Sequence, residues 1–427
     1  MSKKAFMILL GLCLGVLGMT SRAARARLPE PSGSVTQDPP SLGPEIVISK
    51  LDNWQYAPSI AYNSKHREYL VVWENVWPGN LHDIQAQRVS ESGQPVGPSP
   101  IHVATGTKNK MQPDVAYDPV NDRYLVVWIH DVNGDGSNWD ISGRFIPWDN
   151  STPSLPEFKI CDWTSNQWQP RLAYARAQEE FLVVWMNTPP SIPSYISARR
   201  IRASNGTFPA GGFTISAAAQ ARDNPDVAYN LARNEYLVTF DADSSSWDIH
   251  AVRLRGDGVA LGGGEFTIAG WPDDEQVPAV AACDQADQYL VAWQSLRGSD
   301  YDIFARFIKG DGTADTVHEI TAFAGNQEQV KVSCNMAGRE YMLTWQEHII
   351  QTGISGRLVS TSKQLGPGFQ VAAPAPGAGN AYPGLASGHV NHLVAWEHPR
   401  SGSAYQDIHG RLVIPHSLFL PAILRNN

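Results

Sequence analysis

The sequence predicts an all-β fold, a seven-bladed β-propeller in which each blade is a four-stranded antiparallel sheet. The first observation is a strand motif that recurs about every 51 to 57 residues, a period typical of propeller blades. The second is that each copy lies in a unit with four strand-like segments, and the third is a lone strand-like segment ahead of the first unit. The seven copies of the motif are Tyr69–Trp73, Tyr124–Trp128, Phe181–Trp185, Tyr236–Phe240, Tyr289–Trp293, Tyr341–Trp345 and His392–Trp396.

Each unit opens with a short segment of the form proline, any residue, aliphatic residue, small residue. Pro58–Ala61 and Pro113–Ala116 are the first two copies, and only the sixth copy replaces the proline, with Val330. Proline at the first position of a strand removes no ladder hydrogen bond. The small fourth residue suits an innermost strand, where the blades converge on an axis. The recurring Tyr-Leu-Val-Val-Trp segment then has apolar residues on both faces, which indicates a strand covered on both sides by neighbouring blades.

The third and fourth strands complete each unit. The third begins with Asp-Ile in most units, as at Asp83-Ile84, and is followed by a glycine turn such as Ser92-Gly93. The seventh unit ends near Val413 without a clear fourth strand, whereas residues 45–48 have the pattern of one. We therefore expect residues 45–48 to complete blade seven and close the ring, which removes the exposed edges of an open array. An open solenoid is the alternative, and it would need capping repeats that the sequence does not show.

The two ends of the chain lie outside the repeats. Residues 1–26 combine two lysines, an apolar run and Ala24-Arg25-Ala26, the pattern of a cleaved signal peptide rather than of a membrane anchor. Residues 27–43 are rich in Pro, Ser and Gly and indicate a linker, residues 44–414 form the propeller, and residues 415–427 are a sorting segment or an edge strand. We expect a monomer that is secreted or lies at the cell surface, with no membrane span after cleavage.

Charge and cysteine content narrow the class of partner. The formal net charge is −9, which argues against nucleic acid or an anionic membrane as a partner. After cleavage three cysteines remain: Cys161, Cys283 and Cys334. The last two fall at nearly matching places in successive repeats, so a bridge between them is conceivable. Because three cysteines make no disulfide framework, we expect buried free thiols.

The loops between the second and third strands vary most and share one face with the loops between blades, so a ligand is expected there. Four aromatic residues mark these loops: Trp77, Trp139, Trp247 and Tyr301. Exposed aromatic rings can stack on the CH groups of a sugar. Because Trp139, Trp247 and Tyr301 recur with the repeat, the alternative is that these rings pack the blades.

The loop of the second unit contains a possible calcium site. Asp131, Asn133 and Asp135, followed by Gly136, match the first half of a calcium-binding loop. The residue at position twelve is Ser142, where that loop has a bidentate glutamate. The alternative is a solvated turn, in which Asp, Asn and Gly are ordinary residues. We expect no other cofactor.

Motifs for catalysis are scarce. The sequence has no G-x-S-x-G elbow and no H-E-x-x-H helix. Glu74, Asp241, Glu347 and Glu397 lie near the same end of the second strand and could pair as the carboxylates of a glycoside hydrolase. Their recurrence in four of seven units also suggests a feature of the repeat.

The units share five consensus segments, in chain order P-x-V-A-Y, Y-L-V-V-W, D-I-x-A-x-R-V, D-G and F-x-I. This pattern resembles the repeats of large secreted bacterial propeller proteins, over about residues 44 to 414. The resemblance implies the fold and no shared activity. Sialidase-like propellers are more distantly similar, and their S-x-D-x-G-x-x-W box has no good copy here.

The expected function is a non-catalytic extracellular binding or scaffold propeller that engages a glycan or a protein through the loop face. The alternative is a glycoside hydrolase or polysaccharide lyase that uses carboxylates on the same face, and a third possibility is a purely structural role in a surface layer. The fold alone does not decide among them.

Overall fold

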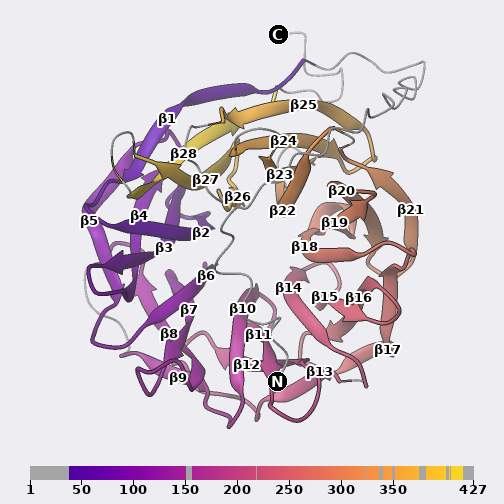
Figure 1. Ribbon diagram of the computed structural model, residues 1–427, viewed down its shortest axis with the longest axis horizontal. Helices are drawn as coiled ribbons and strands as arrows, with labels where there is room; N and C mark the ends of the chain where they lie inside the picture. The colour runs from indigo at the N-terminus through magenta and orange to yellow at the C-terminus, as the bar shows by residue number, and fades with distance from the viewer. Residues whose placement is uncertain are drawn as a thin grey trace, which may run out of the picture. The chain divides into compact units, whose positions relative to one another are not determined.

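The computed structural model describes residues 38–150, 156–217, 219–321, 323–335, 340–348, 352–374, 381–400, 403 and 405–416. The predicted signal peptide, most of the predicted linker and residues 417–427 lie outside the described residues. Residues 38 onward form a compact unit of seven four-stranded antiparallel sheets arranged as a β-propeller, as predicted (Figure 1). Among the described residues, helix is limited to one 3-10 turn, Asp284–Ala286, and no helix there is long and apolar enough to cross a membrane.

The first four blades each run from an innermost strand to an outer strand in chain order. Blade 1 consists of β2 (Trp54–Asn63), β3 (Glu68–Trp77), β4 (Leu81–Ser90) and β5 (Pro95–Ala104). Blade 2 consists of β6 (Lys110–Asp118), β7 (Arg123–Asp131), β8 (Trp139–Pro147) and β9 (Phe158–Cys161). Blade 3 consists of β10 (Asn166–Ala175), β11 (Glu180–Thr188), β12 (Tyr195–Arg202) and β13 (Phe213–Ser216), and blade 4 of β14 (Arg222–Asn230), β15 (Glu235–Asp243), β16 (Trp247–Arg255) and β17 (Ala260–Ala269).

Blades 5 and 6 follow the same order, whereas blade 7 takes its outer strand from the other end of the chain. Blade 5 consists of β18 (Glu275–Cys283), β19 (Gln288–Arg297), β20 (Asp300–Lys309) and β21 (Ala314–Glu319). Blade 6 consists of β22 (Asn326–Asn335), β23 (Glu340–His348), β24 (Thr352–Ser360) and β25 (Leu365–Ala372). Blade 7 consists of β26 (Gly384–Ser387), β27 (His392–Pro399), β28 (Gln406–Ile414) and β1 (Ser41–Ser49).

The N-terminal strand closes the ring, as predicted. β1 pairs antiparallel with β28, from Ser41 opposite Ile414 to Ser49 opposite Ile408. The strand begins at Ser41, four residues ahead of the predicted start. Gly410 of β28 is required by this packing, because a Cβ there would lie 2.7 Å from the Cδ1 atom of Ile48.

The core lies between the blades. The tryptophans of the recurring motif are buried, and those of the first three blades have 0% exposure: Trp73, Trp128 and Trp185. Each apolar cluster combines side chains of two neighbouring blades. The cluster at the closure, for example, joins Ile46 and Ile48 of β1 to Tyr69 and Trp73 of β3. Both faces of the central strand are therefore covered, as its sequence predicts.

Recurring arginines on the third strands join the blades. One group donates from Nη1 to a backbone carbonyl on the outer strand of the preceding blade: Arg144 to Val103, Arg199 to Ile160, Arg306 to Ile268 and Arg411 to Val371. A second group pairs with an acid on the second strand of its own blade: Arg88 with Glu68, Arg200 with Glu180 and Arg253 with Glu235. Both groups belong to the scaffold.

The expectation of free thiols is wrong for two cysteines. Cys283 of β18 and Cys334 of β22 form a disulfide, with their Cα atoms 5.6 Å apart. Cys283 is the last residue of β18 and Cys334 the last but one of β22, the innermost strands of adjacent blades. The separation lies in the range that a disulfide spans. Cys161 is free and buried, and its burial raises the pKa of the thiol to about 12.

The ring closure predicts different effects for two neighbouring residues of β1. Ile48 is 3% exposed and Val47 is 49% exposed. We expect Ile48→Ala to lower the free energy of unfolding by about 2 to 4 kcal/mol, because it leaves a cavity in the cluster between blades 7 and 1. Val47→Ala should change it by less than about 0.5 kcal/mol. Urea denaturation followed by tryptophan fluorescence measures both, and equal effects of the two substitutions would contradict the closure.

Candidate functional site

The loops between second and third strands and the loops between blades share one face, because the strands of each blade alternate in direction. We call this the loop face. In blades 1 to 6, one residue near the axis on this face has a left-handed backbone. It is the residue just before the proline that opens the repeat, or just before Val330 in blade 6. The φ angles are between 50° and 57° at Ala57, Gln112, Gln169, Asn224, Val277 and Gln329. A register shift follows in each strand pair, as between Tyr56 and Ser59. The N–H groups of these residues bond to side chains of the preceding blade.

The usual acceptor is the residue that follows the motif's last aromatic residue. Glu74, Asp241, Gln294 and Glu397 accept from the N–H groups of Gln112, Val277, Gln329 and Ala57, at 3.2, 2.9, 3.0 and 2.8 Å. Between blades 6 and 7, Gln346 accepts from the N–H of Ala381 at 3.0 Å, one residue earlier than in the other blades. Five of the seven blade junctions are joined in this way.

The other two junctions use a different acceptor for the same N–H. Blades 2 and 3 have Ile129 and Met186 after the motif tryptophan, and these side chains cannot accept. The Oε1 atom of Gln112 accepts from the N–H of Gln169 at 2.9 Å, and Oε1 of Gln169 accepts from the N–H of Asn224 at 3.2 Å. These seven hydrogen bonds form a closed circle around the axis, which we call the axial ring.

The axial ring uses three of the four acids that could have formed a catalytic pair. Glu74, Asp241 and Glu397 are 5%, 1% and 3% exposed. Burial raises the pKa of Asp241 and of Glu397 well above the usual range of a carboxyl group. The Oε1 atom of Glu74 also lies 2.6 Å from the Nδ1 atom of His82, within hydrogen-bonding distance. Glu347 lies beyond the ring in β23 and accepts from the hydroxyl of Ser355.

Polar and charged residues of several innermost strands lie near the axis. They occupy the second position of the segment that opens each repeat: Ser59, Asp114, Arg171, Asp226 and Lys331. Ser59 Oγ donates to Asp114 Oδ1 at 2.6 Å across the junction of blades 1 and 2. Burial and, to a smaller extent, the nearby Arg171 lower the pKa of Lys331 to about 8, whereas Asp226 and Asp114 oppose the shift. Asp114, Arg171 and Asp226 belong to blades 2, 3 and 4, and all three affect the pKa of Lys331. The four side chains therefore lie close together.

The four predicted aromatic residues differ in their access to a ligand. Trp77 is 36% exposed, and its Nε1 donates to Asp83 Oδ2 at 2.9 Å. Trp139 is 7% exposed and packs against Trp168 with ring centroids 5.4 Å apart. Trp247 and Tyr301 are half-buried at the starts of β16 and β20. Trp77 is therefore the most accessible ring of the four.

The predicted calcium loop is closed by its own hydrogen bonds. The carboxylate oxygens of Asp131 accept from the N–H groups of Gly134 and Gly136, both at 2.9 Å. Asp135 Oδ1 accepts from the N–H of Ser137 at 2.9 Å, and Asn133 Nδ2 donates to Ser137 Oγ at 2.9 Å. A calcium ion would have to replace the two bonds of Asp131, and the site stays a prediction.

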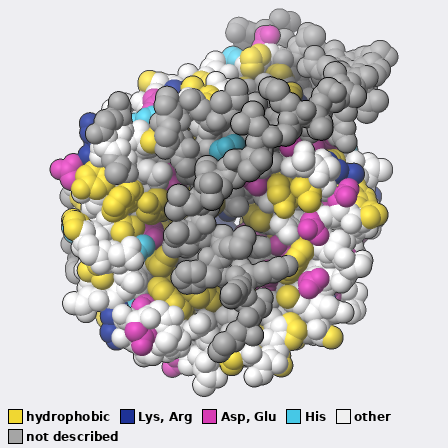
Figure 2. Space-filling model, viewed as in Figure 1, with side chains coloured by type: hydrophobic (Ala, Val, Ile, Leu, Met, Phe, Trp, Pro, Cys, Tyr) yellow, Lys and Arg dark blue, Asp and Glu magenta, His cyan; other side chains and the backbone are white. Residues whose placement is uncertain are grey.

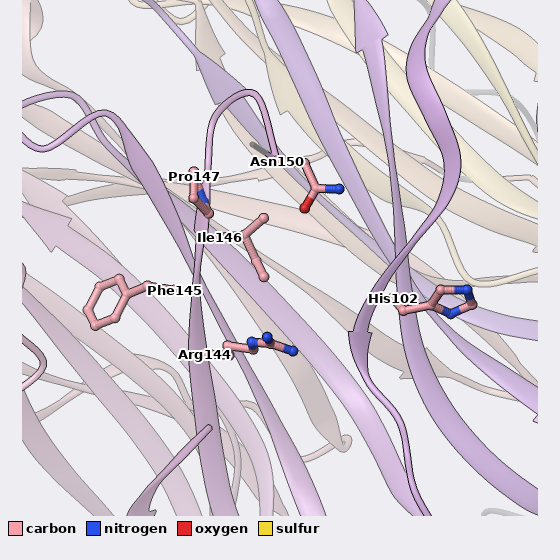
Figure 3. Close-up of a pocket in the computed structure, with 6 residues that line it drawn as sticks. All are labelled: His102, Arg144, Phe145, Ile146, Pro147 and Asn150. Atoms are coloured by element: carbon pink, nitrogen blue, oxygen red, sulfur yellow. The ribbon is translucent and has the colours of Figure 1, made fainter. Parts of the chain in front are cut away.

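A shallow pocket of about 210 Å³ lies between the outer part of blade 1 and the third strand of blade 2 (Figure 3). His102 of β5 and Arg144, Phe145, Ile146 and Pro147 of β8 line it together with Asn150. The volume is below the roughly 300 Å³ of ordinary small-molecule sites. Arg144 is already bonded to the carbonyl of Val103, so we assign this pocket no ligand.

Sequence reasoning named three acids of the axial ring as candidate catalytic residues but missed the ring itself and its other polar members. Gln112, Gln169 and Asn224 each precede the proline that opens a repeat, and a polar residue recurring at that place is the signal that could have found them. Tyr56 was missed as well. It lies beside the ring, where burial and the nearby Glu397 and Glu74 raise the pKa of its hydroxyl to about 12.

Comparisons with solved structures show the same fold. A lectin from Burkholderia pseudomallei matches with a TM-score of 0.63 and 10% identity, over 84% of this chain and 96% of the lectin. A polysaccharide lyase matches with a TM-score of 0.53 and 8% identity, over 88% of this chain and 100% of the lyase. A puromycin hydrolase matches with a TM-score of 0.51 and 12% identity, over 84% of this chain, which spans 52% of that chain's length.

No protein-family model and no curated protein matches the chain. At these identities the structural similarity establishes the β-propeller fold alone. A lectin and a polysaccharide lyase are among the proteins that share this fold.

Glu275 is a buried acid next to the ring and predicts a pH-dependent stability. It is 0% exposed and accepts from Trp271 N–H at 3.0 Å and from Ser295 Oγ at 3.3 Å. Gln55, Gln167 and Gln327 occupy this place in blades 1, 3 and 6. Burial raises the pKa of Glu275 from 4.5 to about 7. Between these two values only the unfolded chain loses the proton, so the contribution of this group to stability falls as the pH rises.

We expect Glu275→Gln to stabilise the protein at pH 8 relative to the parent by as much as about 3 kcal/mol, and to have less effect at pH 4.5. Thermal unfolding at both pH values measures the difference, with the exposed Glu319→Gln as a control. A Glu275→Gln variant whose advantage does not grow between these pH values would contradict the assignment.

The axial ring predicts that the side chain at position 397 stabilises the fold by accepting a hydrogen bond and that it needs no charge to do so. Glu397→Gln should leave the free energy of unfolding within about 0.5 kcal/mol of the parent, because the amide oxygen still accepts from Ala57. Glu397→Ala should lower it by about 1 to 3 kcal/mol, because the buried N–H loses its partner. Denaturant titration compares the two, and equal stabilities would count against the ring.

Proposed function

We propose that this protein is a non-catalytic glycan-binding propeller that engages its ligand through the loop face. The observation that carries the proposal is the use of Glu74, Asp241 and Glu397 in the axial ring. These buried carboxyl groups each accept a hydrogen bond from a backbone N–H, and burial raises the pKa of Asp241 and of Glu397. A glycosidase needs two carboxyl groups free to exchange protons with the substrate or to attack it. The ring leaves these acids no such freedom.

The accessible groups of the loop face suit binding. Trp77 is exposed at the end of β3 and is oriented by its bond to Asp83, so its ring can stack on a sugar. Figure 2 shows one face of the molecule, on which acidic side chains are spread among hydrophobic and polar ones. With a net charge of −9, this surface favours a neutral glycan over a polyanionic one. The fold shared with the Burkholderia lectin is consistent with this ligand class.

The cellular setting is part of the proposal. We infer that the protein is exported by its N-terminal segment and acts outside the cell or at its surface as a monomer. A glycan or an extracellular protein is the partner. Calcium at Asp131, Asn133 and Asp135 would order the loop that joins β7 to β8 on the binding face.

The second candidate is a glycoside hydrolase or polysaccharide lyase. The observation in its favour is that a polysaccharide lyase and an α-L-arabinofuranosidase from Fusarium graminearum have the same fold, the latter with a TM-score of 0.51, 13% identity and coverage of 75% of this chain and 98% of that one. A Glu397→Gln variant separates the two candidates, since it keeps the ring and would remove a catalytic carboxyl. Turnover that this variant abolishes would establish the enzyme.

The deciding experiment screens the purified protein on a glycan array and on a panel of polysaccharides, with calcium and with EDTA. We expect binding of neutral glycans without release of reducing ends or unsaturated products. Loss of binding in EDTA would establish the calcium loop as part of the site. Turnover would favour the enzyme, and silence in both assays would favour a protein partner or a structural role.

Trp77 gives the binding proposal its sharpest test. Trp77→Ala should weaken binding of the best array glycan about tenfold, because the exposed ring no longer stacks on the sugar. Trp148→Ala is the matched control, since Trp148 follows β8 on the opposite face and stacks on His66 at 3.6 Å. Calorimetric titration measures both affinities. Equal losses, or none for Trp77→Ala, would remove Trp77 from the site.

A further inference from the structure

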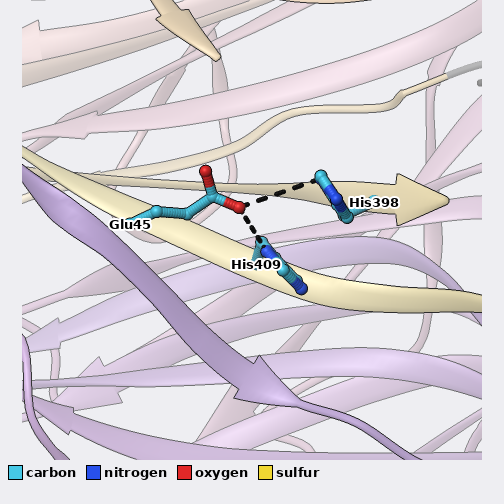
Figure 4. A group of neighbouring side chains, drawn as sticks. All are labelled: Glu45, His398 and His409. Carbon is cyan, nitrogen blue, oxygen red and sulfur yellow. Dashed lines mark hydrogen bonds and ion pairs between the residues drawn. The ribbon is translucent and has the colours of Figure 1, made fainter. Parts of the chain in front are cut away.

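A cluster of two histidines and a glutamate joins three strands of blade 7 (Figure 4). Glu45 comes from β1, His398 from β27 and His409 from β28. Both Nδ1 atoms face the same carboxylate oxygen, Glu45 Oε1, at 2.5 Å from His409 and 3.8 Å from His398. The two imidazole rings are stacked, with centroids 4.1 Å apart and planes at 11°. No motif in the sequence points to this cluster, because Glu45 is more than 350 residues from both histidines.

The distances match a transition-metal site. One ligand atom from each residue lies within 4.8 Å of the other two, and this is the one such group of His, Cys, Asp and Glu in the part of the chain that the structure describes. Tetrahedral zinc with bonds of about 2.0 to 2.1 Å holds its ligand atoms about 3.3 Å apart. The two distances from Glu45 Oε1 lie on either side of this value. Two histidines and one glutamate are a ligand set that zinc uses in proteins, with a further position for water.

We propose that Glu45, His398 and His409 bind a divalent transition metal, zinc foremost, which fastens the N-terminal strand to blade 7. The ligands come from both ends of the chain, so the metal would link the strand that closes the ring to the two strands it joins. This site lies outside the proposed glycan-binding aromatics and stands independently of them.

Blade 4 shows that this cluster is not a by-product of the repeat. His250 occupies the place of His409, and Glu265 of β17 occupies the place of Glu45, since Glu265 lies opposite Val252 as Glu45 lies opposite Arg411. The His250 Nδ1 and Glu265 Oε1 atoms are 2.6 Å apart. The place of His398, however, is taken by the buried Ala242. Glu265 pairs instead with Arg222 at 2.9 Å. Blade 4 therefore has two of the three ligands.

The surroundings orient the glutamate toward the histidines. Arg411 Nη2 lies 3.5 Å from the second oxygen of Glu45, which leaves Oε1 directed at the histidines. A metal would take the place of the hydrogen bond between His409 and Glu45 Oε1.

The test is zinc binding by the purified full chain after removal of metal with EDTA. Equilibrium dialysis against zinc chloride with elemental analysis should give one zinc per chain for the parent and for His250→Ala, the matched control in blade 4. His398→Ala and Glu45→Gln should each lose at least about tenfold in zinc affinity, because each removes one of three protein ligands.

Thermal unfolding provides a second readout. Zinc at about a hundredfold excess over its dissociation constant should raise the melting temperature of the parent and of His250→Ala by about 2 to 5 °C, and should not raise that of His398→Ala. Glu45→Gln keeps a hydrogen-bond acceptor for His409, so it tests the site even if the alanine variant folds poorly. The proposal is overturned if the parent binds no zinc, or if His250→Ala loses zinc as strongly as His398→Ala does.

Discussion

The propeller depends on one backbone N–H at each blade junction that turns toward the preceding blade and must find an acceptor there. In blades 1 to 6 a left-handed residue within the innermost strand produces this geometry, and even Val277 adopts it, at φ 54°. An unpaired N–H at this depth would cost about 1 to 3 kcal/mol per junction. The chain meets the requirement with Glu, Asp or Gln after the motif's last aromatic residue, or with a glutamine of the ring itself where that residue is apolar. The recurrence of acids at this place follows from the hydrogen bond and not from catalysis.

This constraint shapes where function can lie. Because the ring takes up the carboxyl groups nearest the axis on the loop face, chemistry that needs free acids has to come from residues farther out, in loops that differ from blade to blade. Trp77 is such a residue, exposed in a loop that has no equivalent tryptophan in the third blade. The loop face can therefore change its ligand without disturbing the scaffold, which is consistent with one fold serving lectins, lyases and hydrolases.

The sequence was sufficient for the parts of the fold that repeat. The spacing of Trp73 and its counterparts predicts seven blades, and the strand-like pattern at residues 45–48 predicts the closure, because both are local patterns seen several times over. The disulfide of Cys283 with Cys334, the axial ring and the cluster of Glu45 with His398 were not predicted. Each depends on how adjacent blades meet, and that geometry depends on register and on backbone bulges that a single sequence does not display. For the site, Trp77 is exposed and its role in ligand binding stays a prediction, whereas Trp139 is buried in the core.

A metal site would stabilise the propeller most at the ring closure, where β1 joins blade 7. Every other blade is a continuous stretch of chain, but blade 7 takes β1 from one terminus and its three remaining strands from the other. If β1 detaches, the cluster between blades 7 and 1 loses Ile46 and Ile48, and Trp73 loses part of its cover. Because each apolar cluster is shared by two blades, damage at one junction weakens both neighbours. A bound metal adds to stability through its concentration and its affinity for the folded state alone. A metal bound by Glu45 and His409 would connect β1 to β28 in blade 7, the one sheet whose four strands are not a continuous stretch of chain.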